Sequence, residues 1–142
     1  MVPVFVDTGG WIAMAVSRDQ YHKQAAFYYQ GLSRNKVPLL TSNYVLTETY
    51  TRIRYDDGHG KATRFHSLIQ QAIGAGRLRL EWVTPAIHQE AWNIFQDYAD
   101  QAFSLVDCAS FVIARKAGVT ECFSFDEHFN TMDFILRPNQ RQ

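Results

Sequence analysis

The chain has 142 residues, of which 46% are hydrophobic and 14% aromatic, which is enough to bury one core and predicts a single domain spanning 1–142. Its 14 basic and 14 acidic residues cancel, so the net charge by itself does not favour binding to nucleic acid. No apolar stretch is long enough to span a membrane and the N-terminal apolar run has no basic leader, so we expect a cytoplasmic protein that makes no membrane contact.

The first elements alternate between strand and helix patterns. The apolar run 2–6 predicts a short buried strand, and Gly9-Gly10 then turns the chain into a helix over 11–16. Apolar residues at helical spacing predict a second helix over 20–32. A second strand is predicted at 39–41.

The middle of the chain begins with a helix start signal. Ser42-Asn43 is a plausible N-cap for a helix that carries Glu48. The glycine-rich stretch 56–60 predicts a loop, and the apolar stripe of 62–73 predicts the next helix. Alternation over 78–83 predicts a third strand.

The last part of the chain repeats this alternation. Thr84-Pro85 starts a predicted helix, and five of its side chains are expected to be buried: Ile87, Ala91, Ile94, Phe95 and Tyr98. A helix over 104–116, strands at 119–125 and 134–136, and a polar tail at about 139–142 complete the predicted elements. Strands that alternate with helices favour a parallel sheet covered by helices on both faces.

Four carboxylates from distant segments carry most of the functional information. Asp7 and Asp126 each end an apolar strand-like run, and open parallel sheets place their sites at such strand ends. Glu48 and Asp107 lie in predicted helices that are otherwise mostly apolar or neutral. An acid in such a setting costs free energy unless it is paired, solvated or bound to metal.

Each acid also has a local explanation. Asp107 stands in a Ser-x-x-Asp capping pattern, and Asp126 opens a turn. Asp7 could cap the helix that follows it, and Glu48 could pair with Arg52 one turn later. Four independent local roles would be needed, whereas one metal site explains all four acids.

Carboxylates without a Cys or His cluster suit Mg²⁺ or Mn²⁺. Two such ions about 4 Å apart can activate water and stabilise the leaving oxygen in phosphodiester hydrolysis. The hydroxyls of Thr8 and Ser124 stand beside the strand-end acids and could orient a carboxylate or a water, although turn capping explains them equally well. For His128 we expect a surface or supporting position rather than metal ligation.

The charge balance changes if metal covers these acids. Four fewer acids leave 14 basic against 10 acidic residues, which permits weak, salt-sensitive attraction of phosphates. The candidate basic face comprises Arg52, Arg54, Lys61 and Arg64. The two cysteines, Cys108 and Cys122, lie in no CxxC pair, so both are expected to be reduced core residues.

Four segments, taken in order, resemble a PIN-domain ribonuclease of the kind found as VapC toxins of toxin–antitoxin pairs. They span nearly the whole chain, and each is weak alone: Val4-Phe5-Val6-Asp7-Thr8, Thr41-Ser42-Asn43-Tyr44-Val45-Leu46-Thr47-Glu48, Phe103-Ser104-Leu105-Val106-Asp107-Cys108 and Phe123-Ser124-Phe125-Asp126-Glu127-His128-Phe129.

The resemblance implies that Asp7, Glu48, Asp107 and Asp126 are the catalytic and metal-binding acids. Ser124 occupies the family's hydroxyl position, where threonine is commoner. The implied fold is a three-layer α/β/α domain with a parallel five-stranded sheet of order 3-2-1-4-5. The implied activity is divalent-metal-dependent cleavage of single-stranded RNA by a frequent homodimer, with a small antitoxin protein as a possible partner. PIN domains also serve in RNA processing and decay, so the toxin role stays open.

Two other classes with acids at strand ends are disfavoured. A receiver domain needs adjacent acids after strand one and an Asp after strand three, and a haloacid-type phosphatase needs Asp-x-Asp. The chain has Asp7-Thr8-Gly9, and its third predicted strand leads into Val83-Thr84-Pro85 without an Asp. A catalytically dead PIN scaffold that only binds RNA or protein is a third alternative, against which the complete set of acids argues.

Overall fold

A computed structural model describes residues 1–138, and all five of its strands pair in parallel in the order β3-β2-β1-β4-β5. The strands are β1 Val4–Val6, β2 Leu39–Ser42, β3 Leu78–Glu81, β4 Glu121–Phe123 and β5 Ile135–Arg137. The predicted strand order is therefore confirmed. The predicted polar tail at 139–142 lies outside the described residues.

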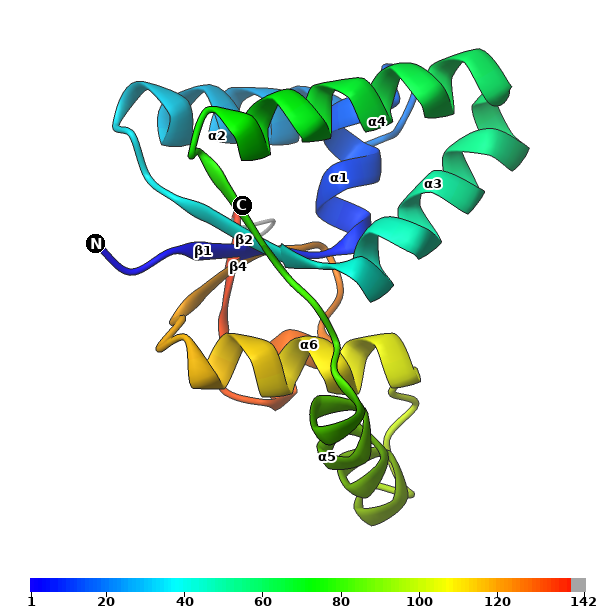
Figure 1. Ribbon diagram of the computed structural model, residues 1–142, viewed down its shortest axis with the longest axis vertical. Helices are drawn as coiled ribbons and strands as arrows, with labels where there is room; N and C mark the ends of the chain where they lie inside the picture. The colour runs from blue at the N-terminus through cyan, green and yellow to red at the C-terminus, as the bar shows by residue number, and fades with distance from the viewer. Residues whose placement is uncertain (139–142) are drawn as a thin grey trace.

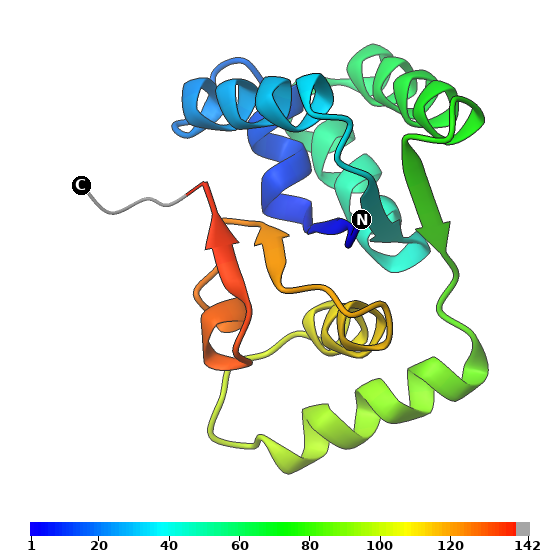
Figure 2. The ribbon, with the colours of Figure 1, turned by 90° about the vertical axis from the view of Figure 1, so that its left-hand side faces the viewer.

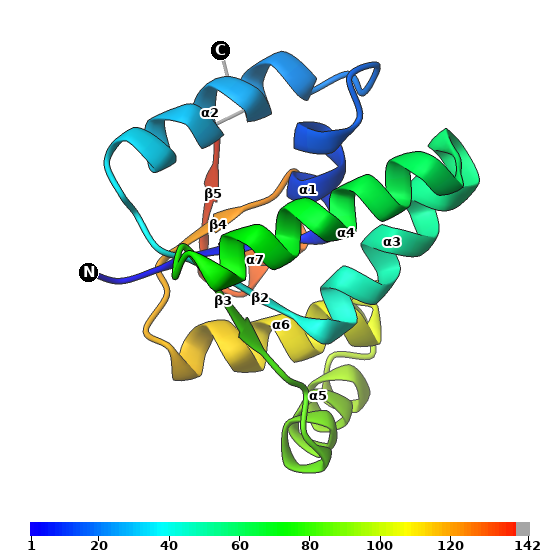
Figure 3. The same cartoon turned by 45° about the horizontal axis from the view of Figure 1, so that its top comes forward.

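Helices cover both faces of this sheet. They are α1 Thr8–Ala15, α2 His22–Arg34, α3 Asn43–Asp57, α4 His59–Gly74, α5 Pro85–Asp97, α6 Leu105–Lys116 and α7 His128–Thr131. The first four lie on one face, and α5 and α6 lie on the other (Figure 1). Seen from another side, α1 lies between α2 and α4 (Figure 3). The three-layer α/β/α prediction is thus confirmed.

The central strands are buried because helices cover them on both faces. All three residues of β1 are buried, as expected for a strand inside a parallel sheet. Phenylalanines fill the layer beside the sheet: Phe5, Phe111, Phe123 and Phe129 have no exposed surface. The rings of Phe111 and Phe129 meet edge to face at 5.1 Å. This packing holds the carboxyl ends of β1 and β4 in place.

The predicted loop at 56–60 is wrong. Helix α3 continues to Asp57 and α4 begins at His59, so Gly58 alone separates them. Gly58 has a φ of 98°, which glycine adopts without steric cost. Arg18 and Lys61 both pair with Asp57 at this corner. Most other boundaries differ from the predicted ones by no more than three residues.

The prediction for the helix after Thr84 is partly wrong. Thr84 does cap α5, since its Oγ1 accepts a hydrogen bond from the Ile87 backbone N–H at 3.2 Å. However, only Ala91 of the five side chains is buried: Ile87 and Ile94 are half-buried, and Phe95 and Tyr98 are 40% and 38% exposed. Helix α5 packs on α6 and lies at the outside of the domain (Figure 2). A helix with one packing partner buries a narrower stripe than a helix lying on a sheet.

The short helix α7, four residues long, was not predicted. Its length gives too few turns for a periodic pattern to be recognised. None of the helices within residues 1–138 combines the length and hydrophobicity needed to cross a bilayer.

The close contact of α1 with β4 at Gly10 leads to a testable prediction. A Cβ added there would lie 2.4 Å from the Phe123 carbonyl oxygen, whereas one added at Gly9 would lie 3.9 Å from its nearest neighbour, the Phe125 nitrogen. We expect Gly10→Ala to lower the free energy of unfolding by about 3 kcal/mol through overpacking. Gly9→Ala is the matched control and should be neutral or stabilising by about 1 kcal/mol. Urea denaturation of both variants measures this, and equal stabilities would contradict the contact.

Candidate active site

Four elements position the four predicted acids. Asp7 follows β1 and Asp126 follows β4 at the same edge of the sheet, while Glu48 lies in the second turn of α3 and Asp107 in the first turn of α6. Asp7 and Asp107 are buried, at 5% and 8% exposure. Asp7 is the N-cap residue of α1, but its side chain makes no capping hydrogen bond. The carboxylate is therefore available for other contacts.

Ser124 joins two of the acids. Its Oγ donates a hydrogen bond to Asp7 Oδ2 at 3.0 Å and accepts one from the Asp126 backbone N–H at 3.1 Å. Ser124 has no exposed surface, so water cannot replace these bonds. The hydroxyl holds the Asp7 carboxylate and the backbone of Asp126 in a fixed relation across β1 and β4.

Thr8 holds the fourth acid. Its Oγ1 donates a hydrogen bond of 2.6 Å to Glu48 Oε1, across 40 positions of the sequence. The alternative pairing of Glu48 with Arg52 is not among the ion pairs that residues 1–138 form. Glu48 is thereby directed toward the residue that follows Asp7.

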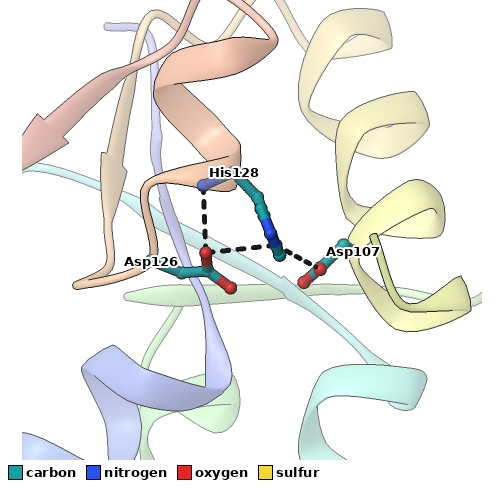
Figure 4. Close-up of side chains that lie close together, drawn as sticks. All are labelled: Asp107, Asp126 and His128. Atoms are coloured by element: carbon teal, nitrogen blue, oxygen red, sulfur yellow. Dashed lines mark hydrogen bonds and ion pairs between the residues drawn. The ribbon is translucent and has the colours of Figure 1, made fainter. Parts of the chain in front are cut away.

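Asp107 and Asp126 meet at His128 (Figure 4). The His128 Nδ1 lies 3.1 Å from Asp107 Oδ2 and 3.2 Å from Asp126 Oδ1. Asp107 also forms the predicted capping box of α6, because its Oδ2 accepts from the Ser104 N–H while Ser104 Oγ accepts from the Asp107 N–H. The capping role of Asp107 is confirmed, and it is compatible with a place in the cluster.

The electrostatics are those of crowded, partly desolvated acids. Burial, then the charge of Asp107 and, less strongly, that of Asp126 raise the pKa of Asp7 to about 7, against the opposing effect of bonds from the Thr8 backbone and Ser124. Burial chiefly raises the pKa of Asp107 as well, with the charge of Asp126 adding to it. The ionised forms are thus destabilised in the protein alone, and a bound cation would relieve this repulsion.

The donor chemistry of this cluster fits a divalent metal. Within residues 1–138, the ligand atoms of Asp107, Asp126 and His128 all lie within 4.8 Å of one another. Carboxylate oxygens with one imidazole are suitable ligands for Mg²⁺ or Mn²⁺. The sequence predicted a surface or supporting position for His128, but it did not predict the contact of His128 with Asp107. The Asp126-x-His128 spacing in a turn was the one pattern that pointed to it.

Comparison with known proteins identifies the family. The PIN domain family matches residues 4–135, which is nearly the whole chain. The chain belongs to the PIN domain family. The predicted recognition and the predicted nuclease class are therefore confirmed.

One curated protein and two solved structures are similar to this chain. The 23S rRNA-specific endonuclease VapC20 of Mycobacterium tuberculosis is 31% identical over 137 residues, which cover 95% of this chain and 98% of that protein. The crystal structure of VapC20, described as a sarcin–ricin loop cleaving toxin, has a TM-score of 0.79 and covers 93% of this chain and 96% of that one. VapBC2 from Rickettsia felis, bound to a promoter DNA fragment, shares 12% identity, a TM-score of 0.66 and coverage of 94% and 96%; it supports the fold alone.

The four candidate cations of this PIN domain do not share one hollow. Lys61 and Arg64 line a groove of about 760 Å³ together with residues of α1 and α2. Arg54 lines a separate hollow of about 280 Å³ between α3 and α4. Arg52 is exposed on α3, one turn after Glu48. Of the four cations, Arg52 is therefore the closest in sequence to one of the predicted acids, Glu48.

Ser124 gives the second prediction. Ser124→Ala removes a buried donor to Asp7 and a buried acceptor for the Asp126 N–H, so we expect nuclease activity to fall about tenfold because both acids lose their alignment. Ser110→Ala is the matched control, since Ser110 is equally buried and bonds only within α6, to the Val106 carbonyl. Steady-state cleavage rates, with thermal melts to compare folding, measure both. Equal activity of the two variants would show that Ser124 does not align the site.

Proposed function

We propose that this PIN-domain protein is a divalent-metal-dependent endoribonuclease that cleaves single-stranded RNA as the toxin of a toxin–antitoxin pair. The convergence of Asp7, Asp107 and Asp126 at one sheet edge carries the proposal. Identity of 31% to an rRNA endonuclease over 95% of the chain supports the choice of RNA. Asp7, Asp107, Asp126 and Glu48 are assigned as the metal-binding and catalytic acids, with Thr8 and Ser124 supporting them.

The chain's own residues account for binding and alignment. Bound Mg²⁺ or Mn²⁺ would lower the pKa of water and stabilise the leaving oxygen of the phosphodiester. Asp7, Asp107 and Asp126 would hold the ion, and Ser124 fixes how two of them face each other. Glu48, which lies in α3, is oriented by Thr8. It would bind either the water or the ion.

The test is a cleavage assay on single-stranded RNA with Mg²⁺ or Mn²⁺ and with excess EDTA. We expect cleavage only with metal, and products with 5′-phosphate and 3′-hydroxyl ends, because water attacks the phosphorus and the 3′-oxygen leaves. Since VapC20 is a 23S rRNA endonuclease, 23S rRNA is the first substrate to use. Undiminished cleavage in EDTA, or 2′,3′-cyclic phosphate products, would refute the mechanism.

Arg52 gives the third prediction, on RNA binding. We assign phosphate contact to this exposed arginine, which lies one turn after Glu48 on α3; Arg54, Lys61 and Arg64 are weaker candidates. Arg52→Gln should weaken RNA binding and reduce the slope of log affinity against log salt by about one. Lys116→Gln is the control, because Lys116 ends α6, pairs with Glu90, and lies at the opposite end of that helix from Asp107. Fluorescence anisotropy in a salt series measures both, and equal slopes would remove Arg52 from the interface.

The proposed partners are a second copy of the chain and a small antitoxin protein. The cytoplasm is the proposed location, consistent with the free, buried Cys108 and Cys122.

Light scattering tests the proposed dimer, and a monomer at working concentration would contradict it. Expression in a heterologous bacterium should arrest growth unless the antitoxin is co-expressed. Normal growth of cells that make the active protein alone would instead favour an RNA-processing or decay nuclease.

A further inference from the structure

His128 lies between two of the acids and shares its nitrogen with both. A single atom, Nδ1, approaches Asp107 Oδ2 at 3.1 Å and Asp126 Oδ1 at 3.2 Å (Figure 4). The three side chains come from the start of α6, the turn after β4 and the start of α7. The proposed function uses only the acids, so the role of the imidazole is unassigned.

These separations match those of neighbouring ligands on one ion. Two adjacent ligands of an octahedral ion with bonds of about 2.1 Å lie about 3.0 Å apart. The two distances from Nδ1 to the carboxylate oxygens are close to that value. One ion could therefore be bound by all three side chains with little rearrangement.

The ring of His128 is held in this position by its surroundings. The His128 backbone N–H donates to Asp126 Oδ1 at 2.9 Å, which ties the residue to its neighbouring acid. Phe103 packs edge to face against the imidazole, with centroids 5.2 Å apart and planes at 82°. Only 28% of the side chain is exposed. These contacts restrict the direction in which the imidazole points.

We propose that His128 binds the divalent ion through Nδ1, together with Asp107 and Asp126, and that it shifts the preference of the site from Mg²⁺ toward Mn²⁺. The proposal rests on the proposed metal dependence of the nuclease. Mg²⁺ favours oxygen ligands, whereas affinity for nitrogen ligands rises along the transition series. Replacing one water or oxygen ligand by an imidazole should therefore favour Mn²⁺.

The experiment is pulsed electron paramagnetic resonance of the full-length protein loaded with Mn²⁺ alone, without RNA. In the wild type we expect nitrogen-14 modulation of the Mn²⁺ echo, and we expect the nitrogen-15 pattern after ¹⁵N-histidine labelling. His128→Gln should lose this coupling while retaining bound Mn²⁺. His59→Gln is the control, since His59 is an exposed residue at the start of α4, and it should keep the coupling.

Metal titrations of the same proteins test the selectivity. His128→Gln should raise the Kd for Mn²⁺ roughly tenfold or more and the Kd for Mg²⁺ by a smaller factor. An equal change in Kd for both ions would contradict the proposed shift in preference toward Mn²⁺.

The outcomes separate the role of His128 from the proposed function. If the wild type binds Mn²⁺ without histidine coupling, or if the coupling survives in His128→Gln, His128 is not a ligand. Either result would leave the proposed metal dependence of the nuclease standing. Failure of the wild type to bind either ion would overturn the proposed metal dependence as well. The labelled wild type needs no substitution, so the test of ligation does not depend on the folding of a variant.

Discussion

Asp7→Asn and Asp107→Asn are each expected to lower RNA cleavage by about a hundredfold or more. Each replaces an ionised carboxylate by a neutral amide of nearly the same shape, so the change is in charge and metal affinity rather than in packing. Loss of a group that merely supports a metal ligand typically costs 10- to 100-fold, and loss of a ligand should cost at least as much. Initial cleavage rates at saturating Mg²⁺ measure the effect.

Glu90→Gln is the matched control for these variants. Glu90 is an exposed acid on α5 whose carboxylate pairs with Lys116 at 3.2 Å, away from the cluster. It should retain activity within twofold, because only a solvated surface ion pair is lost. If Asp7→Asn and Asp107→Asn were as active as Glu90→Gln, the acids would not be the catalytic centre.

The second large effect is on stability. In EDTA, the wild type should lose stability as the pH rises from about 4 to about 7, and Asp7→Asn should not show this loss. Burial, with the charges of Asp107 and Asp126 adding to it, raises the pKa of Asp7 from 3.8 to about 7. A rise of roughly three units corresponds to a free energy on the order of 4 kcal/mol.

The sign of this effect follows from proton linkage. Between the unfolded and folded pKa values, the folded state binds more protons than the unfolded state, so unfolding releases protons and becomes more favourable as pH rises. The stabilisation is complete below about pH 4 and is lost as pH rises through about 7. At neutral pH, metal-free Asp7→Asn should therefore be more stable than the metal-free wild type.

Asp107→Asn should gain less than Asp7→Asn. Asp107 caps α6, where its Oδ2 accepts from the Ser104 N–H, and a negative charge is favourable at a helix N-terminus. The amide oxygen of asparagine can still accept the Ser104 bond, but the lost charge–dipole interaction, about 0.3 to 1 kcal/mol, offsets part of the relief of repulsion. For Asp7, burial and the charges of Asp107 and Asp126 raise the pKa to about 7 despite the bonds from Thr8 and Ser124, so its replacement relieves more.

Thermal melts in EDTA and in Mg²⁺, across pH 4 to 8, test these statements together. A metal at 100 times its dissociation constant should stabilise the wild type by about 2.7 kcal/mol, and both variants should respond much less. Strong destabilisation of both variants without metal would mean that these acids are structural. An unchanged pH profile in Asp7→Asn would mean that another group causes the wild-type dependence.

Local patterns in the sequence were sufficient for the order of the elements. Strand β1 is an apolar run that stops at an acid, and its three residues are buried, as the run predicts for a parallel strand. The caps at Ser42 and Thr84 were readable because a cap is a hydrogen bond over three residues, as the bonds to Val45 and Ile87 show. Such interactions depend on neighbours in sequence alone. The strand order was different: it was implied by the family resemblance, not by any local pattern.

Burial along α5 could not be read in this way. Periodicity gives the apolar face of a helix, but it does not give the width of the surface that covers this face. Because α5 packs on α6 at the outside of the domain, Phe95 and Tyr98 remain partly exposed. The length of the break between α3 and α4 was also overestimated, because Gly58, with a φ of 98°, turns the chain in a single residue.

The sequence by itself determined the family of this protein and predicted four candidate acids, because Asp7 and Asp126 follow strands and the ordered segments around all four resemble those of a PIN domain. Only the tertiary structure decided how they are connected. Thr8 reaches Glu48 across 40 positions, Ser124 reaches Asp7 across 117, and His128 reaches Asp107 across 21. Hydrogen bonds of this kind depend on the distance between elements after packing, which no local pattern encodes. For the same reason the capping role of Asp107 and a place in a cluster of acids were competing explanations in the sequence and became compatible in the fold.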